Sequence, residues 1–215
     1  MTGNKQVYTI VYNALDNFGS SIISKVRLYD IVNKVISKNQ STANIINTLK
    51  RKNKIIYLFN DYFYILNSDE QIKKYYKYSA EEMVFIILNK LKISWHLGLH
   101  SALLINNVNS KDDVFHQVPK TTIIVNSSYS KSIVILNQKF IFKKQTQSRE
   151  VGINKRNTKN RVTFYYSDLE RTYLEYIYYT SASPIAKNIL NSNKLEEYLQ
   201  YFPKTLYNKV NINEK

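Results

Sequence analysis

The segment between residues 40 and 54 holds side chains that can read DNA bases. Asn and Gln pair with adenine through two hydrogen bonds, Arg pairs similarly with guanine, and Thr contacts a polar base edge or a methyl group. In a helix that advances about 100° per residue, Ile45, Ile46 and Leu49 fall on one side. The other side holds Gln40, Asn44, Asn47, Thr48 and Arg51. An apolar back and this polar front suit the major groove of double-stranded DNA.

Basic residues at the end of the segment predict contacts to DNA phosphates. Ser41 or Thr42 can cap the start of the helix, and a tyrosine hydroxyl of the following hairpin can also reach a phosphate. The alternative is a solvated face whose basic last turn complements the helix dipole, with the hairpin aromatics packed inward. The predicted DNA-binding residues are Gln40, Ser41, Thr42, Asn44, Asn47, Thr48, Lys50, Arg51, Lys52, Lys54 and Tyr62.

The elements that would position this helix follow from hydrophobic spacing. Apolar residues at helical spacing predict one helix ending near Gly19 and a second from about Val26 to just before Lys38. The third runs to about Asn53, and two strands at 55–59 and 62–66 flank a tight Asn-Asp turn. This is the element order of a winged helix-turn-helix domain, which we predict for residues 1–68. The same order occurs in winged helices that bind only protein.

The rest of the chain predicts a second domain. Residues 69–78 are polar and are predicted to be a linker, after which Ser79 and Glu82 have the spacing of a capping box. Residues 79–215 are expected to form a mixed α/β domain, so the fold class of the whole chain is α+β. Helices are predicted near 79–91, 99–107, 168–180, 184–191 and 194–201, and strands at 121–125, 132–136, 140–143 and 162–166.

A second basic stretch runs from Lys139 to Arg161 and contains Glu150 as its only acidic residue. The polar residues between its cations predict an exposed loop between strands. Such a loop would contact DNA without base specificity or bind an acidic protein surface, and a solvated loop is the third interpretation. The candidate auxiliary residues are Lys143, Lys144, Lys155, Arg156, Lys159 and Arg161.

Catalytic patterns are sparse. His96 and His100 have a spacing that can hold a metal on a helix, but no HExxH pattern or carboxylate third ligand accompanies them. Asp112-Asp113 precedes a predicted strand that lacks the acid-x-Lys of metal-dependent nucleases, and four glycines provide no phosphate loop. We therefore expect no enzyme, no metal site and no cofactor.

Composition limits the class of protein and of partner. The 215 residues carry a net charge of +15 and contain no cysteine, which excludes disulfides and thiol chemistry. Residues 1–68 have nine Lys and Arg against three Asp and no Glu. A basic protein favours polyanions such as DNA, although AT-rich coding would also enrich Lys and Asn. The longest apolar run, Met83 to Leu88, is too short to cross a bilayer, so we expect a cytoplasmic protein without membrane contact.

Two C-terminal segments resemble a known family. Trp95 to Leu103 is similar to the aromatic-led Ser-Ala-Leu segment of AbiEi-type antitoxins, and Ser167 to Glu175 is similar to their Glu-Arg-Thr helix. Thr121 to Val125 matches their intervening strand, and Phe59 to Leu66 their aromatic-rich wing. The resemblance spans about residues 20–180. It implies a repressor of its own promoter that neutralises a nucleotidyltransferase-like toxin in phage defence or plasmid maintenance.

Three functional hypotheses remain at this point. The first is a DNA-binding transcriptional regulator of the toxin-antitoxin kind, whose partners are double-stranded DNA, a cognate toxin and a second copy of the chain on DNA. The second is a protein-interaction module whose winged helix does not bind DNA. The third is a mobile-element nuclease. Within the C-terminal domain, Ser167 and Glu170 predict a capping box. Arg171 is expected to pair with a neighbouring carboxylate, and the alternative is a contact with a partner.

Overall fold

The computed structural model describes residues 2–18, 21–36, 41–106, 121–145 and 150–212. Gln40 therefore lies outside the described residues, as do Asp112, Asp113 and Arg149, one of the cations of the second basic stretch. The chain is a mixed α+β protein, as the sequence predicts, and divides into two compact units at residues 1–87 and 88–215. No helix in the described ranges is long and apolar enough to span a membrane.

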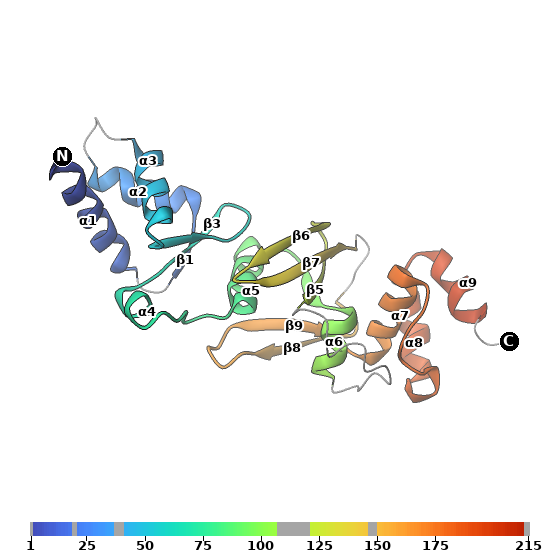
Figure 1. Ribbon diagram of the computed structural model, residues 1–215. Coiled ribbons are helices and arrows are strands. Elements are labelled where there is room, and N and C mark those ends of the chain that lie inside the picture. Colours follow the sequence, from blue (N-terminus) through green and yellow to red (C-terminus); the bar gives the residue numbers. More distant parts are fainter. Residues whose placement is uncertain (1, 19–20, 37–40, 107–120, 146–149, 213–215) are drawn as a thin grey trace. The chain divides into compact units, whose positions relative to one another are not determined.

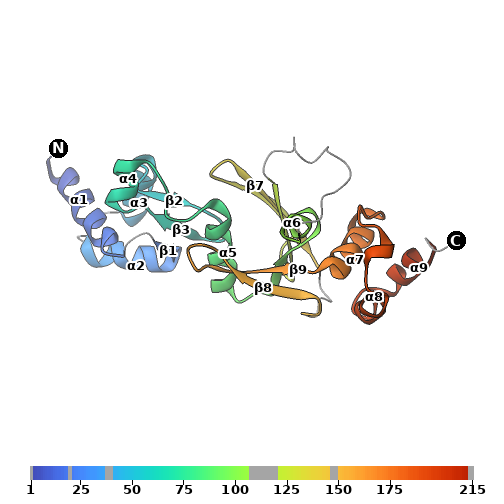
Figure 2. The ribbon, with the colours of Figure 1, turned by 90° about the horizontal axis from the view of Figure 1, so that it is seen from below.

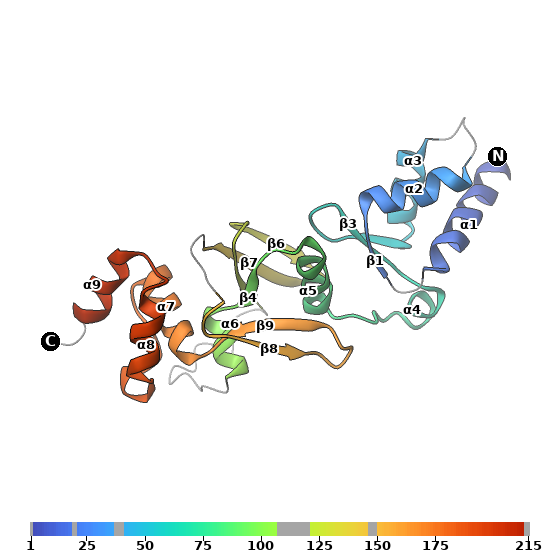
Figure 3. The same ribbon diagram turned by 180° about the vertical axis from the view of Figure 1, so that it is seen from behind.

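The part of the first unit that comes before residue 66 combines three helices with a small sheet (Figure 1). Its elements are α1 (Thr2–Asp16), β1 (Ser21–Ser24), α2 (Lys25–Val35), α3 (Thr42–Arg51), β2 (Ile55–Tyr57) and β3 (Tyr62–Ile65). The three strands pair antiparallel in the order β1-β3-β2. The predicted helices and both hairpin strands are confirmed, whereas β1 was not predicted. Figure 3 shows β1 beside β3, with the helices around them.

The helical periodicity of this unit places its apolar residues in one core. Val11 and Leu15 of α1, Leu28 of α2 and Leu49 of α3 are buried together with Phe63 of β3. Ser24 and Ser41 cap α2 and α3 by accepting hydrogen bonds from backbone amides in the first turns. The Asn60-Asp61 turn has positive φ at both residues and a Tyr62 N–H to Phe59 carbonyl bond of 3.0 Å, as a type I′ turn requires.

The segment predicted as a linker begins with a helix. α4 (Ser68–Lys73) starts in a complete capping box between Asn67 and Glu70. Glu70 is only 1% exposed and accepts bonds from the Tyr64 hydroxyl and the Lys77 backbone. Ser68 donates its backbone N–H and its hydroxyl to Asp16 of α1. These contacts tie α4 to the first unit, and the division of the chain comes later, at residues 87 and 88.

α5 (Ala80–Leu91) spans this division and begins with the predicted capping box of Ser79 and Glu82. The second unit then contains β4 (Trp95–Leu97), α6 (Leu99–Ile105), β5 (Thr121–Asn126), β6 (Lys131–Ile135), β7 (Gln138–Lys144), β8 (Ile153–Asn157) and β9 (Thr163–Ser167). It ends with α7 (Leu169–Thr180), a 3-10 turn (Lys187–Ile189), α8 (Ser192–Leu199) and α9 (Lys204–Ile212). The helix predicted at 184–191 is thus only a 3-10 turn, and β4, β8 and α9 were not predicted.

The second unit is organised around a six-stranded sheet in the order β6-β7-β5-β4-β9-β8. β5 pairs parallel with β7, and β4 pairs parallel with β9, while the other pairs are antiparallel. α7, α8 and α9 pack together (Figure 2) over a core that includes Leu174, Leu195, Phe202 and Leu206. Two segments far apart in sequence, Trp95–Leu97 and Thr163–Ser167, therefore lie side by side.

The prediction of one basic loop from Lys139 to Arg161 is wrong. Lys139, Lys143 and Lys144 lie in β7, and Lys155 and Arg156 lie in the edge strand β8. β5, β4 and β9 separate the two strands, so the cations do not form a single patch. Of the polar residues that suggested a loop, Asn154 and Asn157 belong to β8, which is exposed along Asn154–Asn157 and, among the described residues, pairs only with β9. Thr146 to Ser148 lie outside the described residues.

Candidate nucleic-acid interface

α3 presents polar side chains to solvent opposite its buried face. Ile45, Ile46 and Leu49 are buried in the core of the first unit. Asn44, Asn47 and Arg51 are exposed. The helix therefore has the apolar back and the polar front that its sequence predicts, with two amides and one guanidinium available to a ligand.

Thr48 does not belong to this exposed face. Its side chain is 7% exposed, and its hydroxyl donates to the Asn44 carbonyl at 2.9 Å. The same oxygen lies 3.4 Å from the Tyr8 hydroxyl of α1 and accepts a bond of 3.1 Å from the Arg51 guanidinium. Helical angle alone placed Thr48 beside Asn44, but α1 covers that position. Thr48 thus bonds to α1 and Arg51 and is not part of the exposed polar row of α3.

Ser41 and Thr42 position the helix. The Ser41 hydroxyl accepts from the Asn44 backbone N–H at 3.5 Å, and the Thr42 hydroxyl donates to the side chain of Asn33 on α2. The second contact joins the start of α3 to the last turn of α2. Both residues were predicted as DNA contacts, and both have a structural partner.

The basic residues at the end of α3 differ in where their charges lie. The Lys50 ammonium lies 5.7 Å from the ring centre of Tyr57 and 5.0 Å from that of Phe63. Lys52 is exposed and lies 5.3 Å from the Tyr8 ring. Lys54 instead lies over the Tyr12 ring at 4.1 Å and bonds to Gln71. These contacts hold the Lys54 ammonium against α1 and α4, and burial lowers its pKa.

The hairpin tyrosine beside α3 is Tyr57 and not Tyr62. Tyr57 is paired with Phe63 across the β2–β3 ladder, and their rings meet edge to face at 5.4 Å. Successive side chains of a strand point to opposite faces, so Tyr62 lies on the other face of β3 from Phe63. Sequence alone did not separate these two tyrosines, because the face that α3 covers is set by the tertiary fold.

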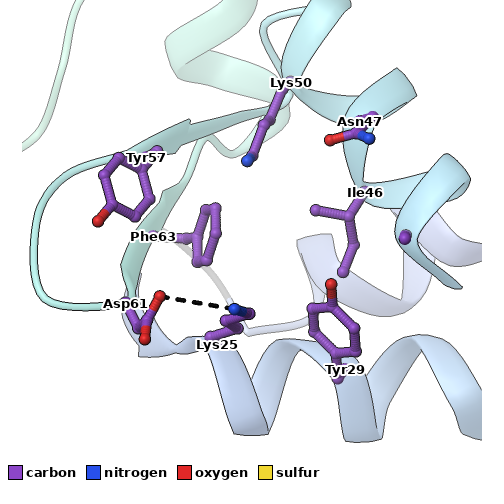
Figure 4. A pocket seen from close by; sticks show the side chains of 9 residues that line it. Lys25, Tyr29, Ile46, Asn47, Lys50, Tyr57, Asp61 and Phe63 are labelled. Carbon is purple, nitrogen blue, oxygen red and sulfur yellow. Dashed lines mark ion pairs between the residues drawn. The ribbon is translucent and has the colours of Figure 1, made fainter.

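A pocket of about 190 Å³ lies between the start of α2, α3 and the hairpin (Figure 4). Its lining combines two lysines, one carboxylate and one amide with aromatic and aliphatic side chains. Lys25 forms an ion pair with Asp61, a second residue of the lining, with 3.7 Å between Nζ and Oδ1 (Figure 4). The lining residues are Lys25, Tyr29, Ala43, Ile46, Asn47, Lys50, Tyr57, Asp61 and Phe63.

The other predicted contacts lie in the second unit. Lys143 is half-buried, 5.7 Å from the Tyr179 ring, whereas Lys144 is exposed. Arg156 is exposed on β8, 5.0 Å from the Tyr166 ring. Lys159 and Arg161 are exposed in the turn that joins β8 to β9. The four cations Lys155, Arg156, Lys159 and Arg161 thus share one hairpin at the edge of the sheet.

A buried polar cluster joins the two segments that carry the family resemblance. His96 Nε2 lies 2.6 Å from Glu175 Oε1, and Arg171 Nε donates to the same oxygen at 3.1 Å. Arg171 also donates to the Val151 carbonyl at 2.6 Å. A Cβ on Gly98 would come within 2.5 Å of Glu175 Oε2, so only glycine fits against the carboxylate there. The expected pairing of Arg171 with a carboxylate is confirmed.

The charges of this cluster follow from its burial. Burial lowers the pKa of His96 below its ordinary value of 6.5, which keeps the imidazole neutral and its Nε2 proton directed at Glu175. Burial alone raises the pKa of Glu175, but His96 and the Arg171 guanidinium outweigh this effect and hold the pKa below its ordinary value. Arg171 and Glu175 are therefore an ion pair, and His96 is a neutral donor to it.

The caps and histidines of this unit also differ from prediction. Asp168, and not Ser167, is the N-cap of α7, because the Ser167 hydroxyl is taken by Thr172 at 2.8 Å. His96 lies in β4 and His100 in α6, so the pair does not share a helix. Among the described residues, no three His, Asp or Glu side chains are grouped so that they could hold a metal ion.

Comparisons with protein-family models and with curated proteins find no match for this chain.

Proposed function

We propose that the first unit is a winged helix-turn-helix domain that binds double-stranded DNA with α3 in the major groove. The observation that carries the proposal is the exposed row of Asn44, Asn47 and Arg51 opposite the buried face of α3. Amides and guanidinium groups are the side chains that discriminate base edges there. The order α1-β1-α2-α3-β2-β3 is also the order of winged helices.

The charge around α3 supports a polyanionic partner. Lys50 and Lys52 flank Arg51 on the last turn of the helix, and neither Lys50 nor Lys52 forms an ion pair within the described part of the chain. Lysines that are not already neutralised can replace the counterions of DNA phosphates, which drives association at low salt. The interface thus combines base-reading groups with groups that bind the backbone.

We propose that the chain is a non-enzymatic transcriptional regulator of the AbiEi antitoxin kind, which represses its own promoter and neutralises a neighbouring toxin. The support is that the two similar segments come together, since the Ser167 hydroxyl bonds to the Leu97 carbonyl and His96 bonds to Glu175. Because these contacts are buried, the resemblance supports a shared fold for the second unit. It leaves the surface that would bind a toxin unspecified.

A mobility-shift assay with DNA upstream of its own gene tests DNA binding. Replacing Asn44, Asn47 or Arg51 with Ala should each cost about 1–3 kcal/mol on the specific site and much less on random duplex. Asn13→Ala is the matched control, since Asn13 is an exposed helical Asn on α1. Equal weakening on both duplexes would assign these residues to positioning. Absence of any shift with the folded protein would favour the protein-interaction module.

A further inference from the structure

The pocket beside α3 has an electrostatic composition that suits a single anion. Two ammonium groups, from Lys25 and Lys50, share it with one carboxylate, from Asp61. The remaining lining is largely apolar and includes Ile46 and Phe63 (Figure 4). Two cations and one anion leave an excess positive charge, which a phosphodiester, with one negative charge, would neutralise.

The two lysines are held differently. Lys50 lies over the rings of Tyr57 and Phe63, a contact that fixes the ammonium in place without removing its charge. Lys25 is instead paired with Asp61 at 3.7 Å. The main chain fixes this pair as well, since the Lys25 N–H donates to the Asp61 carbonyl at 2.6 Å. The hairpin turn therefore holds a carboxylate against one of the two cations of the pocket.

The position of the pocket connects it to the proposed base-reading face. Asn47 lines the pocket and is also one of the three exposed polar residues of α3. Lys50 follows Asn47 by one helical turn, so an anion between Lys25 and Lys50 would lie next to a base contacted by Asn47. In DNA, the anion next to a base edge in the groove is a backbone phosphate.

We propose that this pocket receives a DNA backbone phosphate and that Asp61 is an internal competitor for Lys25, which weakens binding to DNA of any sequence. The inference rests on the proposed DNA-binding function. Its consequence is that binding depends more strongly on correct base contacts, because part of the nonspecific attraction is cancelled by the protein itself. Lys25, Lys50 and Asp61 are then residues that set the balance between specific and nonspecific binding.

The test compares Asp61→Asn with Asp30→Asn in the full chain. Both changes raise the net charge equally, but Asp30 is an exposed residue of α2 that does not line the pocket. Asn tolerates the positive φ of residue 61, and an exposed ion pair contributes little to folding, so the variant should remain folded. The probe is a labelled random-sequence duplex, titrated by fluorescence anisotropy at several salt concentrations.

Asp61→Asn should bind this duplex on the order of threefold more tightly than Asp30→Asn, with a plot of log affinity against log salt that is steeper by about one. Lys25→Gln should weaken binding more in the Asp61→Asn background than in the wild-type chain, because there the lysine is no longer neutralised. Equal affinity and slope for the two Asn variants, with DNA binding intact, would overturn the inference alone. Failure of the wild-type chain to bind any duplex would overturn the proposed function and this inference together.

Discussion

Arg171 is a charged group in the interior of the second unit. It is 2% exposed, and Glu175, its partner four residues along α7, is fully buried. Removal of one member of a buried pair leaves the other charge without solvent or a counter-ion, which costs more than the pair contributes. The conformation of this region thus depends on Arg171 and Glu175 together. Because Arg171 is buried, it does not lie at a surface where a partner could contact it.

Arg171→Ala should destabilise the second unit by about 3–5 kcal/mol, because it leaves the Glu175 carboxylate buried and unpaired. Thermal or denaturant unfolding measures this cost. The control is Arg156→Ala on the exposed strand β8, which should cost less than about 1 kcal/mol. The double change Arg171→Met with Glu175→Gln should cost less than Arg171→Ala alone. A wild-type unfolding midpoint for Arg171→Ala would contradict this role.

His96 makes stability depend on pH in a defined direction. Its pKa in the folded chain is below 6.5, the ordinary value expected after unfolding. As the pH falls below 6.5, the His96 imidazole binds a proton in the unfolded chain before it does so in the folded chain. The free energy of unfolding therefore decreases as the pH falls from 6.5 toward the pKa of His96 in the folded chain. The decrease approaches about 1.4 kcal/mol per pH unit at its steepest.

His96→Gln keeps a donor for Glu175 but does not titrate. Unfolding measured between about pH 7.5 and about pH 5, roughly the range in which an unperturbed histidine titrates, should give a flatter stability profile for this variant. His100, whose pKa burial also lowers, contributes to both proteins, so the difference between the profiles reports His96. Parallel profiles would mean that His96 is not held neutral in the core.

Among the helices and strands, the sequence predicted the ones whose own residues show a hydrophobic pattern together with a capping residue or a turn. α2, α3 and α5 combine helical apolar spacing with Ser caps, and the β2–β3 hairpin combines two continuous apolar runs with an Asn-Asp turn. β1 is a four-residue strand that exists because β3, some forty residues later, pairs with it. β8 is polar on both faces and is a strand only because β9 defines its register. Neither pairing can be predicted from the residues of β1 or β8 alone.

The candidate site shows the same limit. The exposed row of α3 could be predicted because it depends only on helical angle. Other features of the site depend on neighbours that are distant in sequence. α1 covers Thr48, Lys54 lies against Tyr12, and Tyr57 rather than Tyr62 lies on the face of the hairpin beside α3. The pocket between Lys25, Lys50 and Asp61 was missed for this reason, since its three charged residues come from three different elements.

The β8–β9 hairpin is expected to add sequence-independent attraction to DNA. Lys155→Gln with Arg156→Gln should flatten the plot of log affinity against log salt by about one for each phosphate that the hairpin no longer neutralises. The matched pair is Lys143→Gln with Lys144→Gln on β7, which should change the slope less because Lys143 lies against Tyr179. If neither pair changes the slope, the hairpin does not touch DNA, and an acidic protein partner is favoured.

At the scale of the whole molecule, the charge of +15 belongs to two units with separate cores. The core of the first unit lies within Val11 to Ile65, and that of the second includes Leu103 and α7 to α9. α4 is bonded to Asp16, Leu66 and Lys54, so a fragment must retain it to keep these partners. Residues 1–78 contain this core and α4, and they end before α5.

The fragment of residues 1–78 isolates the proposed DNA-binding surface, because it contains α3 and the pocket without the second unit. It should fold, by circular dichroism, and bind the DNA upstream of its own gene in a titration. Asn47→Ala should weaken binding to that DNA by about 1–3 kcal/mol and spare random duplex. A fragment that is folded and binds no DNA at any salt concentration would contradict the claim that this unit is a DNA-binding domain.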